Sequence, residues 1–207
     1  MLEMIEYGNA AAQTVLVQMA DEHSMELIER EIAGIKERTD ADFLMRVFKI
    51  KRWNDELSPW KAPAVFGKEN FGEGAKDTLE EVLANCQGDG RTYYIGGYSL
   101  AGLFALWSAY QTDVFSAVAA ASPSMWFPGF VEYMAEHEIK AGAVYLSLGD
   151  KEAKARNPVM ATVADRINEA HELLQSRGIK CTLEWNEGNH FRDVDSRMIK
   201  AYSQLLR

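Results

Sequence analysis

One segment of the chain constrains the fold more than any other. Residues 92–96 read Thr-Tyr-Tyr-Ile-Gly and predict a short apolar strand, and residues 100–110 predict an apolar helix. Only Gly97, Tyr98 and Ser99 separate the two, so the backbone must pass from strand to helix within three residues. A buried strand that runs directly into a helix is typical of α/β proteins, in which helices cover a parallel sheet.

The rest of the chain repeats this alternation of apolar runs and longer amphipathic segments. We expect strands at residues 14–19, 43–50, 92–96, 117–121, 143–148 and 180–185. We expect helices at residues 24–37, 74–85, 100–110, 131–138, 158–177 and 193–206, and an irregular segment at 51–73. The order predicts a three-layer α/β fold, with a mainly parallel sheet and helices on both of its faces.

Composition and charge narrow the function classes. With 207 residues, 47% of them hydrophobic, the chain can bury one core, and we treat residues 1–207 as a single domain. A net charge of −9 without a lysine or arginine block disfavours binding to nucleic acid or to an anionic membrane surface. No apolar run approaches the ~20 residues of a membrane helix, and the first residues are acidic, so we expect a cytoplasmic protein. The oligomeric state stays open.

The two cysteines predict neither a metal site nor a disulfide. Cys86 and Cys181 lie far apart, and neither belongs to a Cys-x-x-Cys pair. We expect two reduced, partly buried thiols, with no metal and no cofactor in the protein.

The strand–helix turn makes Ser99 a candidate nucleophile. Gly97 stands two residues before it and Ala101 two residues after it, and small residues there allow a tight turn that exposes the serine hydroxyl. The amide of Leu100 then faces a developing oxyanion at the start of a helix. Glycine is more usual at the position of Ala101; one extra methyl group, followed by Gly102, is expected to leave the turn intact. The alternative is an ordinary glycine-rich junction.

A nucleophilic serine needs a base, and His190 is the preferred candidate. It follows the last expected strand, in a tight loop before the final helix. His137 and His171 lie within expected helices, and we interpret them as surface residues. His23 lies near the same edge of the sheet and is interpreted as a capping or surface residue.

The base in turn needs an orienting acid, and two carboxylates compete for this role. Strand 143–148 is followed by Gly149, Asp150, Lys151 and Glu152. The acid usually stands three residues after the glycine, which favours Glu152 over Asp150. The order serine, acid, histidine along the chain is the one that this kind of fold uses. If both carboxylates were solvated loop residues, the serine and the histidine would act as a dyad.

Five short segments carry a resemblance to a known family. They are residues 96–102 (GGYSLAG), 121–126 (ASPSMW), 146–152 (LSLGDKE), 188–191 (GNHF) and, more weakly, 57–60 (LSPW). Together they resemble the esterase family of α/β-hydrolases that includes enterobactin-esterase-like and S-formylglutathione-hydrolase-like enzymes. The resemblance covers roughly residues 55–195. It implies an α/β-hydrolase fold with Ser99 as nucleophile, His190 as base and Glu152 as orienting acid.

The chain departs from this family by being short. Fuller members begin with several antiparallel strands, and here only residues 2–7 can supply one. The segment after strand 117–121 is too short for a cap domain. We therefore expect a minimal, uncapped hydrolase with an open cleft.

The expected reaction is acyl transfer from a small-molecule ester to water. A second oxyanion donor would follow the first strong strand, at Ala20 or Asp21. Trp126, Trp53 and Trp60 are candidates for the pocket wall, although each can instead be a packing residue.

Three functions remain open at this point. A serine carboxylesterase is preferred. A thioesterase or small peptidase would use the same residues, and a catalytically silent binding protein of the same fold is the third possibility.

Overall fold

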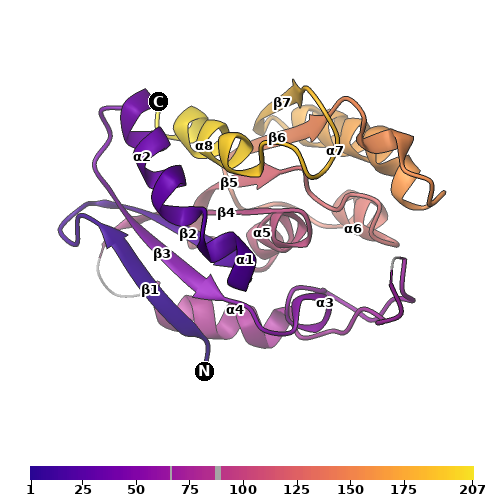
Figure 1. Ribbon diagram of the computed structural model, residues 1–207, viewed down its shortest axis with the longest axis horizontal. Coiled ribbons are helices and arrows are strands. Elements are labelled where there is room, and N and C mark those ends of the chain that lie inside the picture. The colour runs from indigo at the N-terminus through magenta and orange to yellow at the C-terminus, as the bar shows by residue number, and fades with distance from the viewer. Residues whose placement is uncertain (66, 87–89) are drawn as a thin grey trace.

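A computed structural model describes residues 1–65, 67–86 and 90–207 (Figure 1). The described residues form one seven-stranded sheet with strand order β1-β3-β2-β4-β5-β6-β7. The strands are β1 (Glu3–Gly8), β2 (Thr14–Ala20), β3 (Phe43–Lys49), β4 (Thr92–Tyr98), β5 (Phe115–Ala121), β6 (Ala143–Gly149) and β7 (Lys180–Asn186). Strand β1 is antiparallel to β3, and the other neighbours are parallel. The predicted, mainly parallel sheet is confirmed, with one antiparallel strand from the segment at residues 2–7.

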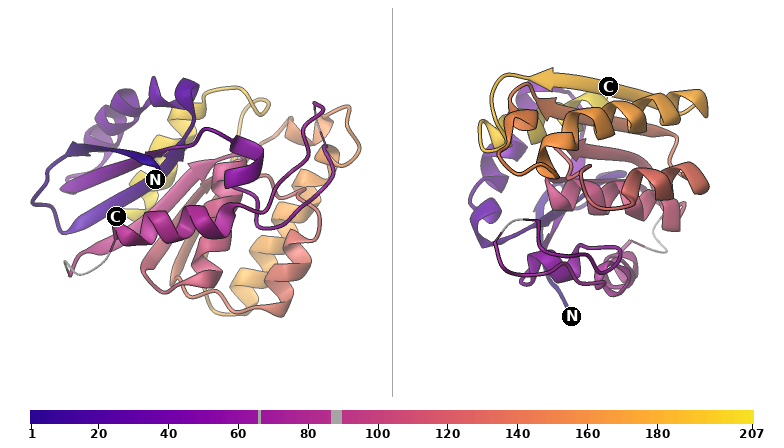
Figure 2. Two further views of the ribbon diagram at one scale, coloured as in Figure 1. Left: turned by 90° about the horizontal axis from the view of Figure 1, so that it is seen from below. Right: turned by 90° about the vertical axis from the view of Figure 1, so that its right-hand side faces the viewer.

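Helices cover both faces of this sheet, which makes three layers (Figure 2). The helices are α1 (Glu22–Met25), α2 (Ile28–Arg38), α3 (Trp53–Glu56), α4 (Ala75–Ala84), α5 (Leu100–Gln111), α6 (Phe130–Glu136), α7 (Val163–Ser176) and α8 (Val194–Leu205), with 3₁₀ turns η1 (Glu152–Lys154) and η2 (Met160–Thr162). Helices α2 and α8 pack on one face, and α4, α5, α6 and α7 contribute to the core on the other. The connection from β5 to β6 contains only the short helix α6, so there is no cap domain, as predicted.

Helix α5 is the most deeply buried helix. All its residues from Leu100 to Tyr110 are buried, because it packs closely against β4 and β5. A helix that is apolar on every side is stable only in such a place. Its start is thereby fixed at the carboxyl edge of the sheet, where the candidate site residues lie.

Two of the expected helices differ from the prediction. The helix expected at residues 24–37 is divided into α1 and α2, and the Asp21 side chain caps α1 by accepting a hydrogen bond from the Ser24 amide. The helix expected from residue 158 begins at Val163, because the Asn157 side chain accepts from the amides of Val159 and Met160 and holds a separate turn.

The segment at residues 51–73 is mainly irregular, as expected. It contains only the short helix α3 and an isolated bridge between Ala62 and Phe71, and residue 66 lies outside the described residues. Cys86 is buried and Cys181 half-buried, and no disulfide joins them.

Candidate active site

Ser99 sits at a strained turn between β4 and α5. Its backbone φ is 58° and its ψ is −122°, a conformation that residues other than glycine rarely adopt. A side chain at Gly97 would meet the backbone carbon of Ala101 at 2.6 Å and its methyl group at 2.7 Å. The Ala101 methyl group therefore occupies the space beside Gly97. This is why alanine is accepted at a position where glycine is more usual.

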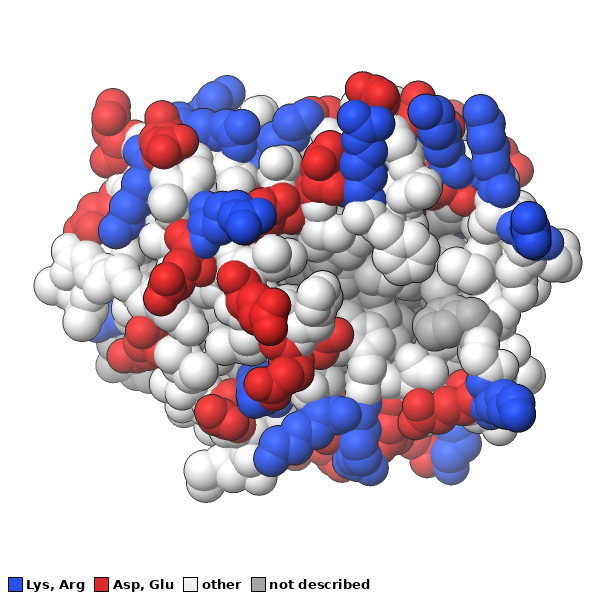
Figure 3. Space-filling model, in the orientation of Figure 1, with Lys and Arg blue, Asp and Glu red and all other residues white. Residues whose placement is uncertain are grey.

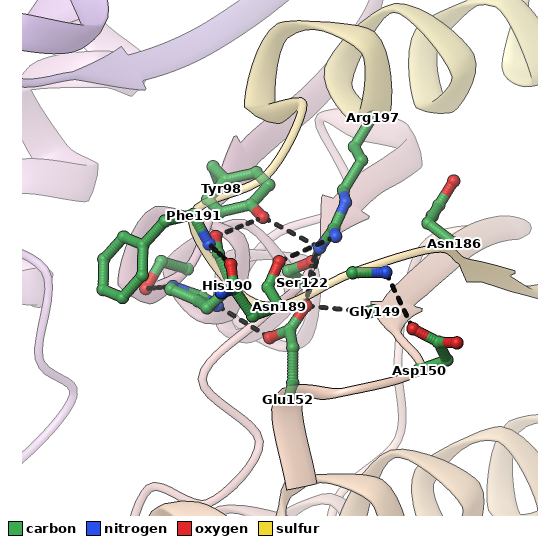
Figure 4. A network of polar contacts seen from close by, with 12 residues as sticks. Tyr98, Ser122, Gly149, Asp150, Glu152, Asn186, Asn189, His190, Phe191 and Arg197 are labelled. Carbon is green, nitrogen blue, oxygen red and sulfur yellow. Dashed lines mark hydrogen bonds and ion pairs between the residues drawn. The ribbon is translucent and has the colours of Figure 1, made fainter. Parts of the chain in front are cut away.

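The structure brings Ser99, His190 and Glu152 together in one hydrogen-bonded row. Figure 4 shows the contact between His190 and Glu152. Nε2 of His190 lies 2.9 Å from Oγ of Ser99, and Nδ1 lies 2.7 Å from Oε2 of Glu152. When Nδ1–H donates to the carboxylate, Nε2 is free to accept the serine proton. The Glu152 side chain is 4% exposed and that of His190 is 23% exposed, so solvent reaches the ring but hardly the carboxylate.

The Glu152 carboxylate is held by further donors on its other oxygen. Oε1 accepts from the hydroxyl of Ser122 at 2.9 Å, the amide of Gly149 at 2.7 Å and the guanidinium of Arg197 at 2.6 Å. Burial alone raises the pKa of Glu152, but hydrogen bonds from His190, Gly149 and Ser122 outweigh it, so its pKa lies below the usual value. The group therefore stays ionised and can stabilise a positive charge on the ring.

Arg197 is a central residue of the site that the sequence analysis missed. Its side chain, from α8, is 1% exposed and reaches the Glu152 carboxylate (Figure 4). It also donates to the carbonyl of Asn189 at 2.9 Å and to the hydroxyl of Tyr98 at 3.0 Å. Tyr98 in turn donates to the carbonyl of His190 at 2.8 Å. One side chain thus ties the acid to the loop that carries the histidine.

A signal for Arg197 was present in the sequence. The residue lies three positions after Val194 and one before Met198, which both belong to the apolar stripe of the last helix. A cation on a buried stripe needs a buried partner.

The two serines of the segment at residues 121–126 support the site from the loop that follows β5. Ser122 adopts a φ of 43° and donates to Glu152, and the amide of Ser124 donates to the carbonyl of Ser99 at 3.0 Å. The hydroxyl of Ser124 lies 3.3 Å from that of Ser99. The sequence analysis recognised this segment only through the family resemblance and assigned no role to its serines.

Asp150 does not take part in the row. Its carboxylate accepts from the amide of Gly188 at 2.7 Å, and its own amide donates to the carbonyl of Asn186. Asp150 therefore fastens the loop that precedes His190, and of the two candidates it is Glu152 that contacts the ring.

Comparisons with known proteins were made by sequence and by structure. Neither a family model nor a curated protein matches the sequence. Among solved structures, an IroE-like serine hydrolase from Shewanella oneidensis superposes with a TM-score of 0.79 at 14% identity, covering 99% of this chain and 75% of that one. The siderophore hydrolase EstA from Aspergillus nidulans has a TM-score of 0.68 at 19% identity, covering 96% and 85%. The enterobactin esterase FES from Shigella flexneri has a TM-score of 0.61 at 12% identity, covering 99% and 60%.

The chain has the α/β-hydrolase fold. The similar structures are serine hydrolases and esterases of the kind that the sequence resembles, which confirms the resemblance. In this fold the nucleophile follows a central strand, and the acid and the histidine come later in the chain. Ser99, Glu152 and His190 occur in that order and meet at one edge of the sheet.

Of the expected oxyanion donors, Leu100 follows Ser99 directly and Asp21 shares a cavity with it. Leu100 is the first residue of α5, so its amide has no partner within the helix. Ala20 ends β2 and is fully buried, with its carbonyl accepting from Ile50, whereas Asp21 lines the cavity at Ser99. The second donor stays a prediction, with Asp21 the better placed of the two.

Two cavities flank His190. The first, which we call the Ser99 cavity, has a volume of about 360 Å³; Ser99, His190, Asp21, Trp53 and Phe191 are among its lining residues. The second, which we call the Glu152 cavity, has a volume of about 180 Å³; Glu152, His190, Trp126, Lys151 and Lys154 are among its lining residues. Both are open, and Figure 3 shows a hollow in this face with acidic side chains gathered over α1 beside it.

The three tryptophans proposed for the pocket wall occupy different places. Trp53 lines the Ser99 cavity and Trp126 lines the Glu152 cavity. Trp60 is a correction: it is absent from the described lining of both. Its ring packs against Phe127 and Tyr133, and its indole N–H donates to the carbonyl of Pro128, which are the contacts of a packing residue.

Within the described residues, no helix is long and apolar enough to cross a membrane. In the same part of the chain, no three histidine, cysteine or acidic side chains gather as a metal site would require. Burial raises the pKa of the Cys181 thiol to about 12, so this cysteine is a poor nucleophile.

Proposed function

We propose that this protein is a serine hydrolase that cleaves a small-molecule carboxylic ester through an acyl-enzyme intermediate. The observation that carries the proposal is the continuous hydrogen-bonded row from Ser99 through His190 to a buried, ionised Glu152. The strained turn at Ser99 supports it, because such strain persists where the surrounding structure enforces a functional geometry.

The reaction begins with proton transfer from the Ser99 hydroxyl to Nε2 of His190 as Oγ attacks the ester carbonyl carbon. The carbonyl oxygen becomes an oxyanion, which the amide of Leu100 stabilises at the start of α5. The His190 ring, now positively charged, is stabilised by the Glu152 carboxylate. It then gives its proton to the leaving alkoxy oxygen, the carbon–oxygen bond breaks, and the acyl group remains on Ser99.

Water completes the cycle by the same steps. His190 takes a proton from the water, the resulting hydroxide attacks the acyl carbon, and the ring returns the proton to Oγ of Ser99 as the acid leaves. These steps use only side chains and backbone amides, so no metal ion or organic cofactor is required.

A fluorophosphonate probe and p-nitrophenyl acetate test this proposal directly. The wild-type protein should be labelled at Ser99, and Ser99→Ala should lose labelling and reduce turnover on the order of 10³-fold or more, with nearly unchanged stability. Ser176→Ala removes an exposed serine at the end of α7 and should behave as wild type. Labelling at another residue, or a folded wild-type protein that is neither labelled nor active, would contradict the proposal.

The same experiment separates the competing functions. A silent binding protein would stay unlabelled although folded. A thioesterase or a peptidase would be labelled but would prefer a thioester or an anilide over the matching oxygen ester in a panel with a constant acyl group.

We also propose a cytoplasmic location, because two cysteines without a disulfide are typical of a reducing compartment.

A further inference from the structure

The floor of the Ser99 cavity carries two buried polar side chains that the proposed reaction does not use. Gln18 from β2 and Glu31 from α2 both line this cavity. Nε2 of Gln18 donates to Oε2 of Glu31 at 2.9 Å. Gln18 is 3% exposed and Glu31 is 2% exposed, so the pair is almost wholly withdrawn from solvent.

This pair has spare acceptors and too few donors. Oε1 of Gln18 has no hydrogen-bond partner among the described residues, and the carboxylate of Glu31 receives only the one amide bond there. A buried carboxylate usually receives several donors or a cation, because burial without them is costly. Amide and carboxylate oxygens only accept hydrogen bonds, so what the pair lacks is a donor.

The charged side chains in the lining around the pair are acidic. Asp21 is a further acidic residue of the cavity lining, and the described lining contains no lysine or arginine. Across His190, the Glu152 cavity is lined by Lys151 and Lys154. A positively charged group therefore finds the better electrostatic environment in the Ser99 cavity.

The sheet register gives the distance from the pair to the reacting hydroxyl. Gln18 pairs with Gly96, and Ser99 follows three residues later along β4. At about 3.3 Å per strand residue, the pair lies on the order of 10 Å from Ser99. A hydrogen bond between the pair and the ligand takes up ~3 Å of this distance. The ligand itself must then span about 7 Å from its hydrogen-bonding end to the ester, which is roughly six bonds of an extended chain.

We propose that Gln18 and Glu31 form a recognition site for an ammonium group on the ester, about six bonds from the reacting ester group. The inference rests on the proposed esterase function and names its substrate class. An ammonium group offers three donors and a charge, which matches a carboxylate beside a vacant amide oxygen. The aromatic rings of Trp53 and Phe191 in the same lining suit the methylene chain and the cation.

Matched esters test the proposal. The first series contains p-nitrophenyl esters of 6-aminohexanoate, heptanoate and adipate, which present an ammonium, a methyl or a carboxylate group at the same distance. The second series compares 5-aminopentyl acetate with hexyl acetate, in case the leaving alcohol occupies the cavity. In at least one series, kcat/KM should favour the ammonium over the methyl compound by about tenfold or more.

Two variants of α2 separate the site from general charge effects. Glu31→Gln keeps the shape of the side chain and should remove most of the ammonium preference. Glu29→Gln removes an exposed glutamate of the same helix and should leave the preference unchanged. An equal ammonium-to-methyl ratio in wild type and Glu31→Gln, or no preference in either series, would overturn the proposal.

The preference should also depend on pH. Burial raises the pKa of Glu31 to about 7, with the nearby charge of Asp195 adding to this and the Gln18 hydrogen bond opposing it. The other titratable groups that face the pair or its cavity are Asp21, His23, Tyr98, His190 and Tyr202. The ammonium-to-methyl ratio should rise from pH 6 to pH 8 in wild type and stay flat in Glu31→Gln.

A binding measurement distinguishes failure of this inference from failure of the proposed function. If the folded protein hydrolyses no ester, calorimetric titration of Ser99→Ala with hexylammonium, hexanol and hexanoate still probes the site. Tighter binding of hexylammonium than of hexanol, lost when Glu31→Gln is added, would support the site. Equal binding of the two would refute it whatever the reaction.

Discussion

Replacing Arg197 tests whether the site depends on the buried cation that joins its parts. The guanidinium lies 2.6 Å from Glu152, and the two side chains are 1% and 4% exposed. Arg197→Met keeps much of the apolar volume and removes the charge together with every hydrogen bond of the guanidinium. Breaking a buried ion pair by removing one partner costs about 3–5 kcal/mol, because the remaining charge is left in a poorly solvated place.

The expected loss is large compared with the whole stability of a domain, which is about 5–15 kcal/mol. Urea unfolding should therefore show a midpoint well below that of wild type. Activity should fall as well, because Arg197 also holds the carbonyl of Asn189, next to the histidine. Since Arg197 lies behind the acid rather than in a substrate cavity, kcat should fall while KM changes little. Arg197 is a positioning residue. A fall in kcat with little change in KM distinguishes this role from a role in substrate binding.

Two further variants keep the test interpretable. Arg197→Lys retains the charge but not the forked geometry, so it should recover part of the stability and part of kcat. Arg192→Met removes an arginine that is 49% exposed and pairs with Glu187 and Asp193 near the surface, so its urea midpoint should stay close to that of wild type. If Arg197→Met and Arg192→Met had equal midpoints and equal kcat, the buried network would not hold the site together.

Other substitutions test single features of the fold and the site. Glu152→Gln should lower kcat for p-nitrophenyl acetate on the order of 10³-fold or more, whereas Asp150→Asn should change it only a few-fold; the reverse order would reassign the acid. The pKa of Glu31 rises from 4.5 to about 7 on folding, so the folded protein binds a proton that the unfolded chain releases, and stability falls as pH rises between these values. Relative to wild type, the free energy of unfolding of Glu31→Gln should therefore rise by about 3 kcal/mol between pH 4.5 and pH 8, measured by urea unfolding. Gly97→Ala should lower the melting temperature, because its Cβ would lie 2.6 Å from backbone; Gly142→Ala, with its nearest contact at 4.0 Å, should not.

The sequence predicted those parts of the molecule that depend on local pattern and chain order. Strands buried on both faces are apolar throughout, and parallel strands end at one edge of the sheet, so residues that follow different strands meet there. This is why Ser99, Glu152 and His190 could be assigned to one site before any distance was known. The choice between Asp150 and Glu152 stayed open because both follow the same strand. The turn η1 buries Glu152 and leaves Asp150 exposed, which supports the proposal that Glu152 is the acid.

What the sequence did not predict are buried polar residues on otherwise amphipathic helices. Arg197 and Glu31 lie on the buried faces of α8 and α2, where a pattern of apolar and polar residues assigns charged types to solvent. Their partners, Glu152 and Gln18, come from other elements of the fold, 45 and 13 residues away along the chain. The apolar stripe of α8 marks Arg197 as a buried position, but only the packed structure reveals which residue it contacts.

The two buried glutamates show how the surroundings give one residue type two different states. Both Glu152 and Glu31 are less than a tenth exposed, and burial raises the pKa of each. Around Glu152 an imidazole, a guanidinium, a hydroxyl and an amide donate, and the pKa falls below its usual value. Around Glu31 a single neutral amide donates, and the pKa rises to about 7. The number and charge of the donors lower the pKa of Glu152, and the deeper burial of Glu31 adds to the difference. A donor that arrives with a substrate would therefore move Glu31 toward the state of Glu152, and the free energy of that change would add to the binding of the substrate that carries it.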